Sequence, residues 1–255
     1  MRKSVAIITG ASSGMGREFV RHIVSRYSFL DEIWVIARRQ ERLESLREHF
    51  GDKIVPIALD LSSVHSMKVL SAKLDIEKPN VKILVNSAGM GIIGRFDELD
   101  NDEISDMVNL NVNALTSVTR AVIPYMSKGS YIINLASSAA FLPQPGFSVY
   151  AASKSYVLSL SRALNAELQK KGIYVSAVTP GPVRTEFFGN AERHHKIAFY
   201  KKFVMADPKK VVELALKDAK LHADISVYSP TMKLMMILTK LLPHRFLIKI
   251  MNIFA

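Results

Sequence analysis

The fold is decided by the stretch Ser4-Val5-Ala6-Ile7-Ile8-Thr9-Gly10-Ala11-Ser12-Ser13-Gly14-Met15-Gly16. Its first half is a continuous apolar run, which is typical of a strand buried on both faces of a parallel sheet. Its second half is rich in Gly and Ser and leads into a run with apolar side chains at helical spacing. Glycines allow a tight strand-to-helix turn, so that the N-terminus of the helix can hold a phosphate group. The stretch therefore predicts a nucleotide-binding βα unit, although an ordinary βα turn also contains glycines.

Further apolar runs alternate with helical patterns along the rest of the chain. We expect strands at residues 33–37, 54–59, 81–85, 131–135 and 173–178, and a short edge strand at 225–227. Helices are expected between them, among them a long one over residues 102–125 that contains three asparagines. This alternation predicts an α/β fold of the Rossmann type, with a doubly wound, mostly parallel sheet and helices on both faces.

Composition limits the class of protein. The 255 residues are 49% hydrophobic and 22% charged, which suits one compact domain over residues 1–255. The absence of cysteine excludes disulfides, thiolate metal ligands and cysteine nucleophiles, and a cytoplasmic location is expected. His194 and His195 are adjacent and have no carboxylate at matching spacing, so we expect no metal site.

The formal charge of +11 is compatible with nucleic acid, an anionic membrane or an anionic ligand. Lysines and arginines are spread along the chain and no recognition motif accompanies them, so we expect no nucleic-acid partner. A phosphorylated cofactor, an acidic substrate or a lipid surface accounts for the excess charge more simply.

Tyr150 and Lys154 are four residues apart in a strongly helical segment. This spacing puts both side chains on one face of a helix, so that an ammonium lies beside a phenol. A nearby positive charge lowers the pKa of a tyrosine, which can then exchange protons with an alcohol or a carbonyl oxygen. By itself the spacing is weak, because an amphipathic helix with a solvated lysine shows it too.

Other motifs accompany this pair: the glycine-rich turn, Asn86-Ser87-Ala88-Gly89, and Ser137, thirteen residues before Tyr150. Together they resemble the short-chain dehydrogenase/reductase family, and the resemblance runs from residue 4 to residue 185. The family usually has Asn-Asn-Ala-Gly, so Ser87 is a departure. The resemblance implies an NADP(H)- or NAD(H)-dependent oxidoreductase in which a tyrosine, a lysine, a serine and an asparagine act together.

The resemblance assigns four catalytic residues, and Ser138 is the alternative if the serine register is off by one. Tyr150 would exchange the proton, Lys154 would bind the nicotinamide ribose, and Ser137 would hold the substrate oxygen. Asn111 would disturb its helix and hold a water molecule for proton transfer. Asn109 and Asn113 are expected to form a local hydrogen bond and to lie at the surface.

The end of the second strand predicts the cofactor. The fold places an acidic residue there when the ribose 2′-hydroxyl of NAD is bound. Here Arg38 and Arg39 follow Ala37, and an arginine can form a forked contact with a 2′-phosphate. The sequence therefore favours NADP(H) over NAD(H), with Arg38 as the first choice for the phosphate contact. The alternative is that both arginines simply begin a solvated helix.

The remaining cofactor contacts are implied by the resemblance. Asp60 and Leu61 would lie at the adenine, although Asp60 before two serines also suits a turn or a helix cap. The full set of expected cofactor residues is Gly10, Ser12, Ser13, Gly14, Met15, Gly16, Arg38, Arg39, Asp60, Leu61, Asn86, Ala88, Gly89, Tyr150, Lys154, Pro180, Gly181, Val183 and Thr185.

Apolar loops at residues 90–96, 141–147 and 187–200 favour a hydrophobic alcohol or ketone as substrate, such as a steroid, a bile acid, a retinoid or a fatty-acyl compound. Residues 186–206 form either a mobile lid or a packed peripheral helix. A non-catalytic NADP(H)-binding regulator of the same fold is the alternative function.

The C-terminal extension, residues 230–255, is apolar and basic. Five apolar residues lie on one helical stripe, with two lysines among them: Leu234, Ile237, Leu238, Leu241 and Leu242, with Lys233 and Lys240. Three interpretations remain open: a contact in a homodimer or homotetramer, a cap over the core, or peripheral contact with a membrane. In the last case, a membrane-surface scaffold is a further alternative function.

Overall fold

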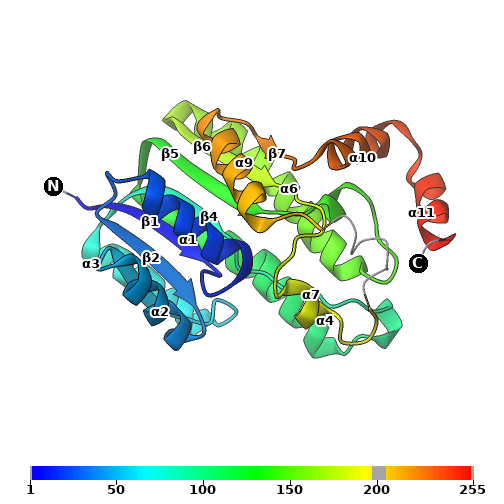
Figure 1. The fold of residues 1–255 in the computed structure, drawn as a ribbon, viewed down its shortest axis with the longest axis horizontal. Coiled ribbons are helices and arrows are strands. Elements are labelled where there is room, and N and C mark those ends of the chain that lie inside the picture. The colour runs from blue at the N-terminus through cyan, green and yellow to red at the C-terminus, as the bar shows by residue number, and fades with distance from the viewer. Residues whose placement is uncertain (1, 197–204, 254–255) are drawn as a thin grey trace.

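The computed structural model describes residues 2–196 and 205–253, and its centre is one parallel β-sheet (Figure 1). Within these residues the sheet has seven strands in the order β3-β2-β1-β4-β5-β6-β7. The strands are β1 Ser4–Thr9, β2 Glu32–Ala37, β3 Ile54–Ala58, β4 Asn80–Asn86, β5 Met126–Leu135, β6 Ile173–Val178 and β7 Ile225–Ser226. The predicted Rossmann-type fold is confirmed.

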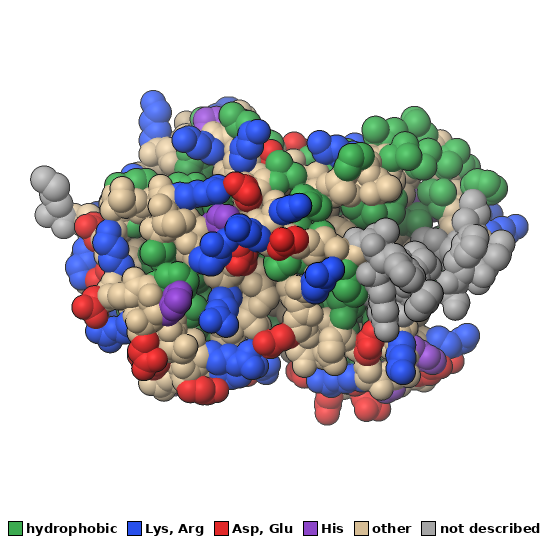
Figure 2. Space-filling view, in the orientation of Figure 1, with side chains coloured by type: hydrophobic (Ala, Val, Ile, Leu, Met, Phe, Trp, Pro, Cys, Tyr) green, Lys and Arg blue, Asp and Glu red, His purple; other side chains and the backbone are tan. Residues whose placement is uncertain are grey.

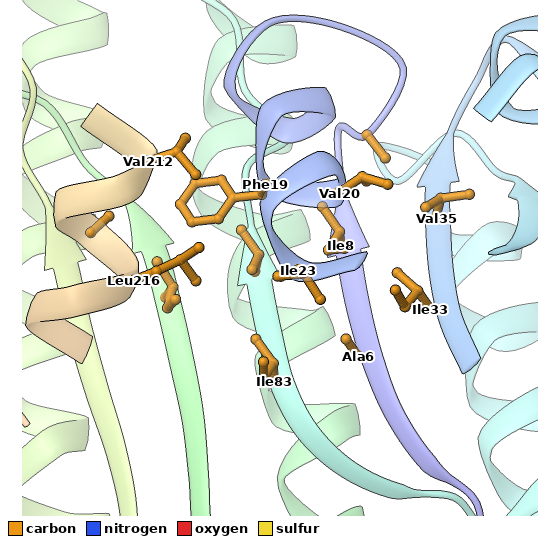
Figure 3. Close-up of a cluster of buried hydrophobic side chains, with 14 of the residues drawn as sticks. Ala6, Ile8, Phe19, Val20, Ile23, Ile33, Val35, Ile83, Val212 and Leu216 are labelled. Atoms are coloured by element: carbon orange, nitrogen blue, oxygen red, sulfur yellow. The ribbon is translucent and has the colours of Figure 1, made fainter. Parts of the chain in front are cut away.

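Helices cover both faces of the sheet because successive side chains of a buried strand point to opposite faces. One face packs on α1 Gly14–Arg26, α2 Gln40–Phe50 and α9 Pro208–Lys220. The other packs on α3 Val64–Glu77, α5 Leu115–Val122 and α6 Ser148–Leu168. In β1, Ala6 and Ile8 join the first cluster while Val5 and Ile7 join the second. Figure 3 shows the first cluster, with the ring of Phe19 extending from α1 toward Val212 and Leu216 of α9.

Smaller elements connect and flank these strands and helices. These are α4 Asn101–Val108, α7 Phe187–Ala191, α10 Pro230–Leu241 and α11 His244–Ile253, with short 3₁₀ turns at Phe96–Glu98, Ile123–Tyr125, Ser138–Phe141 and Gln169–Lys171. Figure 1 shows α10 and α11 at the edge of the molecule, beyond β7.

The long helix expected over residues 102–125 is interrupted. α4 passes into a π-helical segment, Asn109–Ala114, before α5 begins. Asn111 lies inside this segment and is fully buried, while Asn113 donates to Asn109 at the surface, over 2.9 Å. π-Segments inside helices are rare and are frequent at functional sites. Strand ends also differ: β5 begins five residues earlier than predicted, and β3 and β7 each end one residue earlier.

The order of the strands places a crevice between β1 and β4. β1 pairs with β2 on one side and with β4 on the other, so the chain reverses its direction of winding at this point. In open parallel sheets, ligands bind at such a point, outside the carboxyl ends of the strands. The glycine-rich turn after β1 and the motif after β4 both lie there.

Gly16 is essential to the turn after β1. A Cβ at this position would lie 2.1 Å from the carbonyl oxygen of Gly10, so α1 and the turn are in backbone contact. We expect Gly16→Ala to lower the free energy of unfolding by about 3 kcal/mol, because no side chain can move to relieve the overlap. Urea denaturation of both proteins measures this change. Gly189→Ala is the matched control, since a Cβ there meets nothing within 4 Å, and an equal effect of the two substitutions would contradict the packing described here.

Candidate active site

A cavity of about 720 Å³ extends along the carboxyl ends of β1, β2, β4 and β5. All of the site residues expected from the sequence line it except three, which are Gly16, Asn86 and Asn111. A second cavity of about 550 Å³, between α3 and α5, is lined by none of the expected residues. The sequence motifs therefore converge on one place in the fold.

The N-terminus of α1 opens into this cavity. Gly14 begins the helix with a φ of +51°. Ser13 occupies the N-cap position, but its side chain forms no capping hydrogen bond. The first N–H groups of a helix have no partner within the helix and attract anions. This end of the cavity therefore suits a phosphate group.

Two arginines after β2 differ in their partners. Arg39 donates to Ser12 Oγ over 3.3 Å and lies 3.8 Å from the carboxylate of Glu186. Glu186 also binds Arg42, with both oxygens 3.0 Å from Nη1. Arg38 is exposed and lines the cavity, and within the described part of the chain it forms no ion pair. Of the two candidates, Arg38 is thus the cation that is available to a ligand.

Asp60 and Leu61 lie at the same end of the cavity. Asp60 accepts a hydrogen bond from the backbone N–H of Ser62, over 3.0 Å, so the turn chemistry considered for it is present. It also lines the cavity, as does the mostly buried Leu61. The two interpretations of Asp60 are therefore compatible.

Asn86 does not reach the cavity, in contrast to its predicted place among the cofactor contacts. It is 1% exposed, and its amide donates to Thr119 Oγ1 and to Asn134 Oδ1, at 2.8 and 2.9 Å. Its side chain points to the face of the sheet that packs on α5, where Thr119 lies. Asn86 joins β4 to β5 and α5, beneath the loop that lines the cavity.

Thr9 was not among the expected site residues. Its hydroxyl accepts hydrogen bonds from the backbone N–H groups of Ser87 and Ala88, both at 3.1 Å. It thereby fixes the loop after β4 against the end of β1. A single polar residue at the end of an apolar strand was the available signal in the sequence.

Helix α6 places Tyr150 and Lys154 one turn apart. The Lys154 ammonium lies 5.6 Å from the centre of the Tyr150 ring and donates to the carbonyl oxygen of Leu135 over 2.7 Å. The side chain of Ser137, at the end of β5, hydrogen-bonds Tyr150 and also accepts from the N–H of Ala139 at 3.1 Å. Contact with Tyr150 supports the register that selects Ser137 over Ser138.

Burial controls the protonation of this pair. It raises the pKa of Tyr150 to about 12, against the lowering effect of the Ser137 hydrogen bond. It also lowers the pKa of Lys154 to about 8. Burial thus opposes the lowering expected from Lys154, because loss of water disfavours both charged forms, and the ammonium is directed to Leu135.

Asn111 lies behind the cavity wall. Its amide forms two hydrogen bonds with the backbone of Met90, at 2.8 and 2.9 Å, and donates to Ser153 Oγ over 3.0 Å. The π-helical segment turns the side chain toward this loop and toward α6. Asn111 thus connects the loop after β4 with the helix that carries Tyr150 and Lys154.

Aromatic side chains surround Tyr150. Phe147 stacks on its ring at a centroid distance of 4.3 Å, and Phe187 of α7 lies at 5.4 Å. A Cβ on Gly91 would lie within 3 Å of all three rings, so only glycine fits here. This end of the cavity is apolar.

Residues 186–206 are described only in part. Phe187 and Phe188 line the cavity, whereas 197–204 lie outside the described residues. His194 and His195 contact two different carboxylates, those of Glu103 at 2.8 Å and Glu98 at 2.7 Å.

Lys154→Met tests the burial of the lysine. The Lys154 pKa is about 8 in the folded protein and 10.5 when unperturbed, so between these values the unfolded chain binds more protons. Folding stability should therefore rise with pH, by on the order of 2 kcal/mol between about pH 7.5 and 9.5. Denaturation at both pH values should show this rise in the native protein and lose it in Lys154→Met.

Lys170→Met is the control, because Lys170 is exposed. If the rise persists in Lys154→Met, another group is responsible for it.

Within residues 2–196 and 205–253, none of the helices combines the length and the apolar character that a bilayer crossing requires.

Known proteins are similar to this chain in sequence and in fold. Sulfoacetaldehyde reductase 2 of Chromohalobacter salexigens is 32% identical over 237 residues, which cover 88% of this chain and 91% of that protein. A short-chain dehydrogenase from Sphingobium yanoikuyae, solved in complex with NADPH, is 30% identical with a TM-score of 0.77, covering 88% of this chain and 87% of that one. The 3-ketoacyl-(acyl-carrier-protein) reductase from Brucella melitensis, complexed with NADH, is 25% identical with a TM-score of 0.75, covering 89% and 96%.

The sequence profile of the short chain dehydrogenases matches residues 4–196, which include β1 to β6 and the Tyr150 helix. The match extends slightly beyond the region in which the motifs were recognised. The chain is therefore an oxidoreductase that belongs to the short-chain dehydrogenase family.

Proposed function

We propose that the protein interconverts a secondary alcohol and a ketone on a hydrophobic small molecule, with NADP(H) as cofactor. One observation carries this proposal. A single cavity joins the unpaired cation of Arg38 at one end to Tyr150, Ser137 and Lys154 at the other.

The described residues fit NADP(H). The uncapped start of α1 suits the pyrophosphate, and Arg38 suits the 2′-phosphate that distinguishes NADP(H) from NAD(H). Pro180, Gly181, Val183 and Thr185 also line the cavity, and the family resemblance assigns them to the nicotinamide end of the cofactor. When bound, the cofactor supplies or accepts a hydride at carbon 4 of the nicotinamide.

Tyr150 acts as the acid in the direction of reduction. Since its pKa is about 12, it remains protonated at neutral pH and can give a proton to the carbonyl oxygen. Ser137 hydrogen-bonds Tyr150, so its hydroxyl also lies where the substrate oxygen must be held. In oxidation, Tyr150 would have to accept a proton as phenolate, which its burial disfavours. The same hydroxyl serves both directions, because a catalyst lowers the barrier of the forward and the reverse reaction alike.

Lys154 supplies positive charge below about pH 8 and would bind the ribose hydroxyls of the cofactor. Asn111 has no direct access to the cavity, and its hydrogen bonds position Met90 and α6. The family resemblance implies that it would also hold a water molecule that passes protons to Lys154.

The substrate end of the cavity supports a hydrophobic molecule. Phe147, Phe187, Leu142, Met232 and Met235 line it. We propose a steroid, bile acid, retinoid or fatty-acyl compound on this basis, because apolar walls stabilise apolar ligands.

Arg193 favours a second candidate, a substrate that carries an acidic group. It lines the cavity and is half exposed, and its only described ion pair is with Glu103, at 3.4 Å. The related reductase from Chromohalobacter salexigens is named for a sulfonated aldehyde. An acidic group in the substrate would compete with Glu103 for Arg193.

Consumption of NADPH, and separately of NADH, tests both candidates. Three panels are compared: uncharged hydrophobic ketones, 3-oxo acids, and sulfonated short aldehydes. We expect the hydrophobic ketones with NADPH to give the fastest reaction. Faster turnover of the acidic panels would select the second candidate. NADPH binding without any turnover would instead support a non-catalytic regulator. Such a regulator has no need of Tyr150, Lys154 and Ser137, all of which this chain retains.

A further inference from the structure

Helix α10 has one face on the protein. Thr239 is buried, and Met232 and Met235 line the cavity. Met232 packs closely on the turn after β6, since a Cβ on Gly181 would lie 2.9 Å from its sulfur. The inner face of α10 is thus part of the wall near Tyr150.

The outer face of α10 is also apolar. Its residues follow the spacing i, i+3, i+4 and i+7, and their exposed fractions are large: Leu234 56%, Ile237 49%, Leu238 38% and Leu241 74%. Figure 2 shows hydrophobic side chains gathered over α10 and α11, unlike the mixed charges on the rest of this face. A surface helix normally directs its polar side to solvent, and a contiguous exposed apolar patch marks an interaction site.

Positive charge borders this patch. Lys233 and Lys240 are seven residues apart, which places both on the same edge of the apolar stripe. Arg245 and Lys249 follow on α11, and all four basic residues are exposed. Among the described residues none of the four forms an ion pair. Residues 225–255 contain no Asp or Glu.

We propose that α10 and the beginning of α11 dock on the surface of an anionic phospholipid bilayer. The leucines and Ile237 would enter the boundary between head groups and acyl chains, and the lysines would contact the lipid phosphates. Self-association through this face is disfavoured, since a two-fold contact would place two patches of the same positive charge against each other. The segment has no acidic residue to pair with them.

The position of α10 adds a consequence that rests on the proposed function. The helix presents one face to the bilayer while its methionines line the cavity, so a lipophilic ketone could pass from the membrane into the site. Membrane docking itself requires no turnover, and its test is therefore separate.

Sedimentation of the full chain with vesicles tests the proposal. We expect binding to vesicles of equal parts phosphatidylcholine and phosphatidylglycerol to be at least about tenfold stronger than to phosphatidylcholine alone. The triple variant Leu234→Gln, Ile237→Gln, Leu241→Gln should bind at least about tenfold more weakly, because glutamine retains helix propensity and removes apolar contact. Lys233→Glu with Lys240→Glu should weaken binding by a similar factor.

Two controls isolate the surface. Leu221→Gln and Ile76→Gln remove exposed apolar side chains elsewhere, 69% and 81% exposed, and should leave vesicle binding unchanged. Thermal unfolding verifies that each variant is folded.

Three outcomes would overturn the proposal. The first is that the native protein stays in solution with anionic vesicles. The second is that the triple variant sediments with them as well as the native protein does. The third is a native dimer that dissociates in the triple variant during sedimentation velocity, with no vesicle binding. The face would then be an interface between copies of this chain.

Discussion

Tyr150→Phe is expected to lower NADPH-dependent turnover by about 10³-fold while it leaves NADPH affinity within about twofold. The substitution removes only the phenolic hydroxyl, and the ring keeps its stacking on Phe147 at 4.3 Å. Without the hydroxyl, no buried acid remains beside Ser137 to protonate the carbonyl oxygen. Steady-state rates and cofactor titration by calorimetry measure the two effects separately.

Tyr156→Phe is the matched control for this prediction. Tyr156 lies on the same helix, is 39% exposed, and pairs with Thr116 Oγ1 at 3.0 Å, away from the cavity. Its turnover should stay within about twofold of the native value, because surface substitutions have small effects. Should Tyr150→Phe retain the native rate, the assignment of the acid is wrong.

Arg38→Asp is expected to reverse the cofactor preference. Loss of the charge-assisted contact should weaken NADPH binding by about 10- to 100-fold, since such hydrogen bonds contribute about 1.5–3 kcal/mol. The new carboxylate repels a 2′-phosphate but accepts hydrogen bonds from the 2′-hydroxyl of NADH. The ratio of the two dissociation constants, measured by calorimetry, reports the change.

Arg47→Asp makes the same change of charge on α2, away from the cavity. Arg47 pairs with Asp52 at 3.3 Å, so its replacement alters the net charge without touching the cofactor. The control should keep the native ratio. An Arg38→Asp protein with the native ratio would show that the 2′-phosphate is held elsewhere, with Arg39 as the next residue to replace.

The fold could be predicted because strand burial repeats along the chain. A short apolar run such as Val5 to Ile8 is typical of a strand that is buried on both faces of a sheet. The glycine turn after it fixes the direction of the next helix. Helix geometry within residues 101–125 was harder to predict. A π-helical segment depends on where Asn111 finds its partners, and these come from the Met90 loop, about twenty residues away in sequence.

Much of the candidate site was also visible in the sequence. Tyr150 and Lys154 lie one turn apart on the same helix, which their spacing predicts. Ser137 follows β5 and lines the same cavity. The orientation of Asn86 depends on tertiary structure, because a residue at the end of a strand can point to either side and here its partners are Thr119 and Asn134.

Protonation and exposure depend on tertiary structure. Spacing alone predicts that Lys154 lowers the pKa of Tyr150, whereas burial of both groups has the larger effect. The stripe on α10 is similar: its periodicity is evident in the sequence, but only the packing of Met232 and Thr239 shows that the stripe faces outward.

Transfer of deuterium tests the central claim most directly. The native protein is given NADPH that carries deuterium at carbon 4 of the nicotinamide, together with the panel of hydrophobic ketones, and the products are analysed by mass spectrometry. We predict an alcohol with deuterium on its carbinol carbon, and no such product with Tyr150→Phe. An NADPH-bound protein that yields no labelled alcohol from any ketone would contradict the proposed reaction.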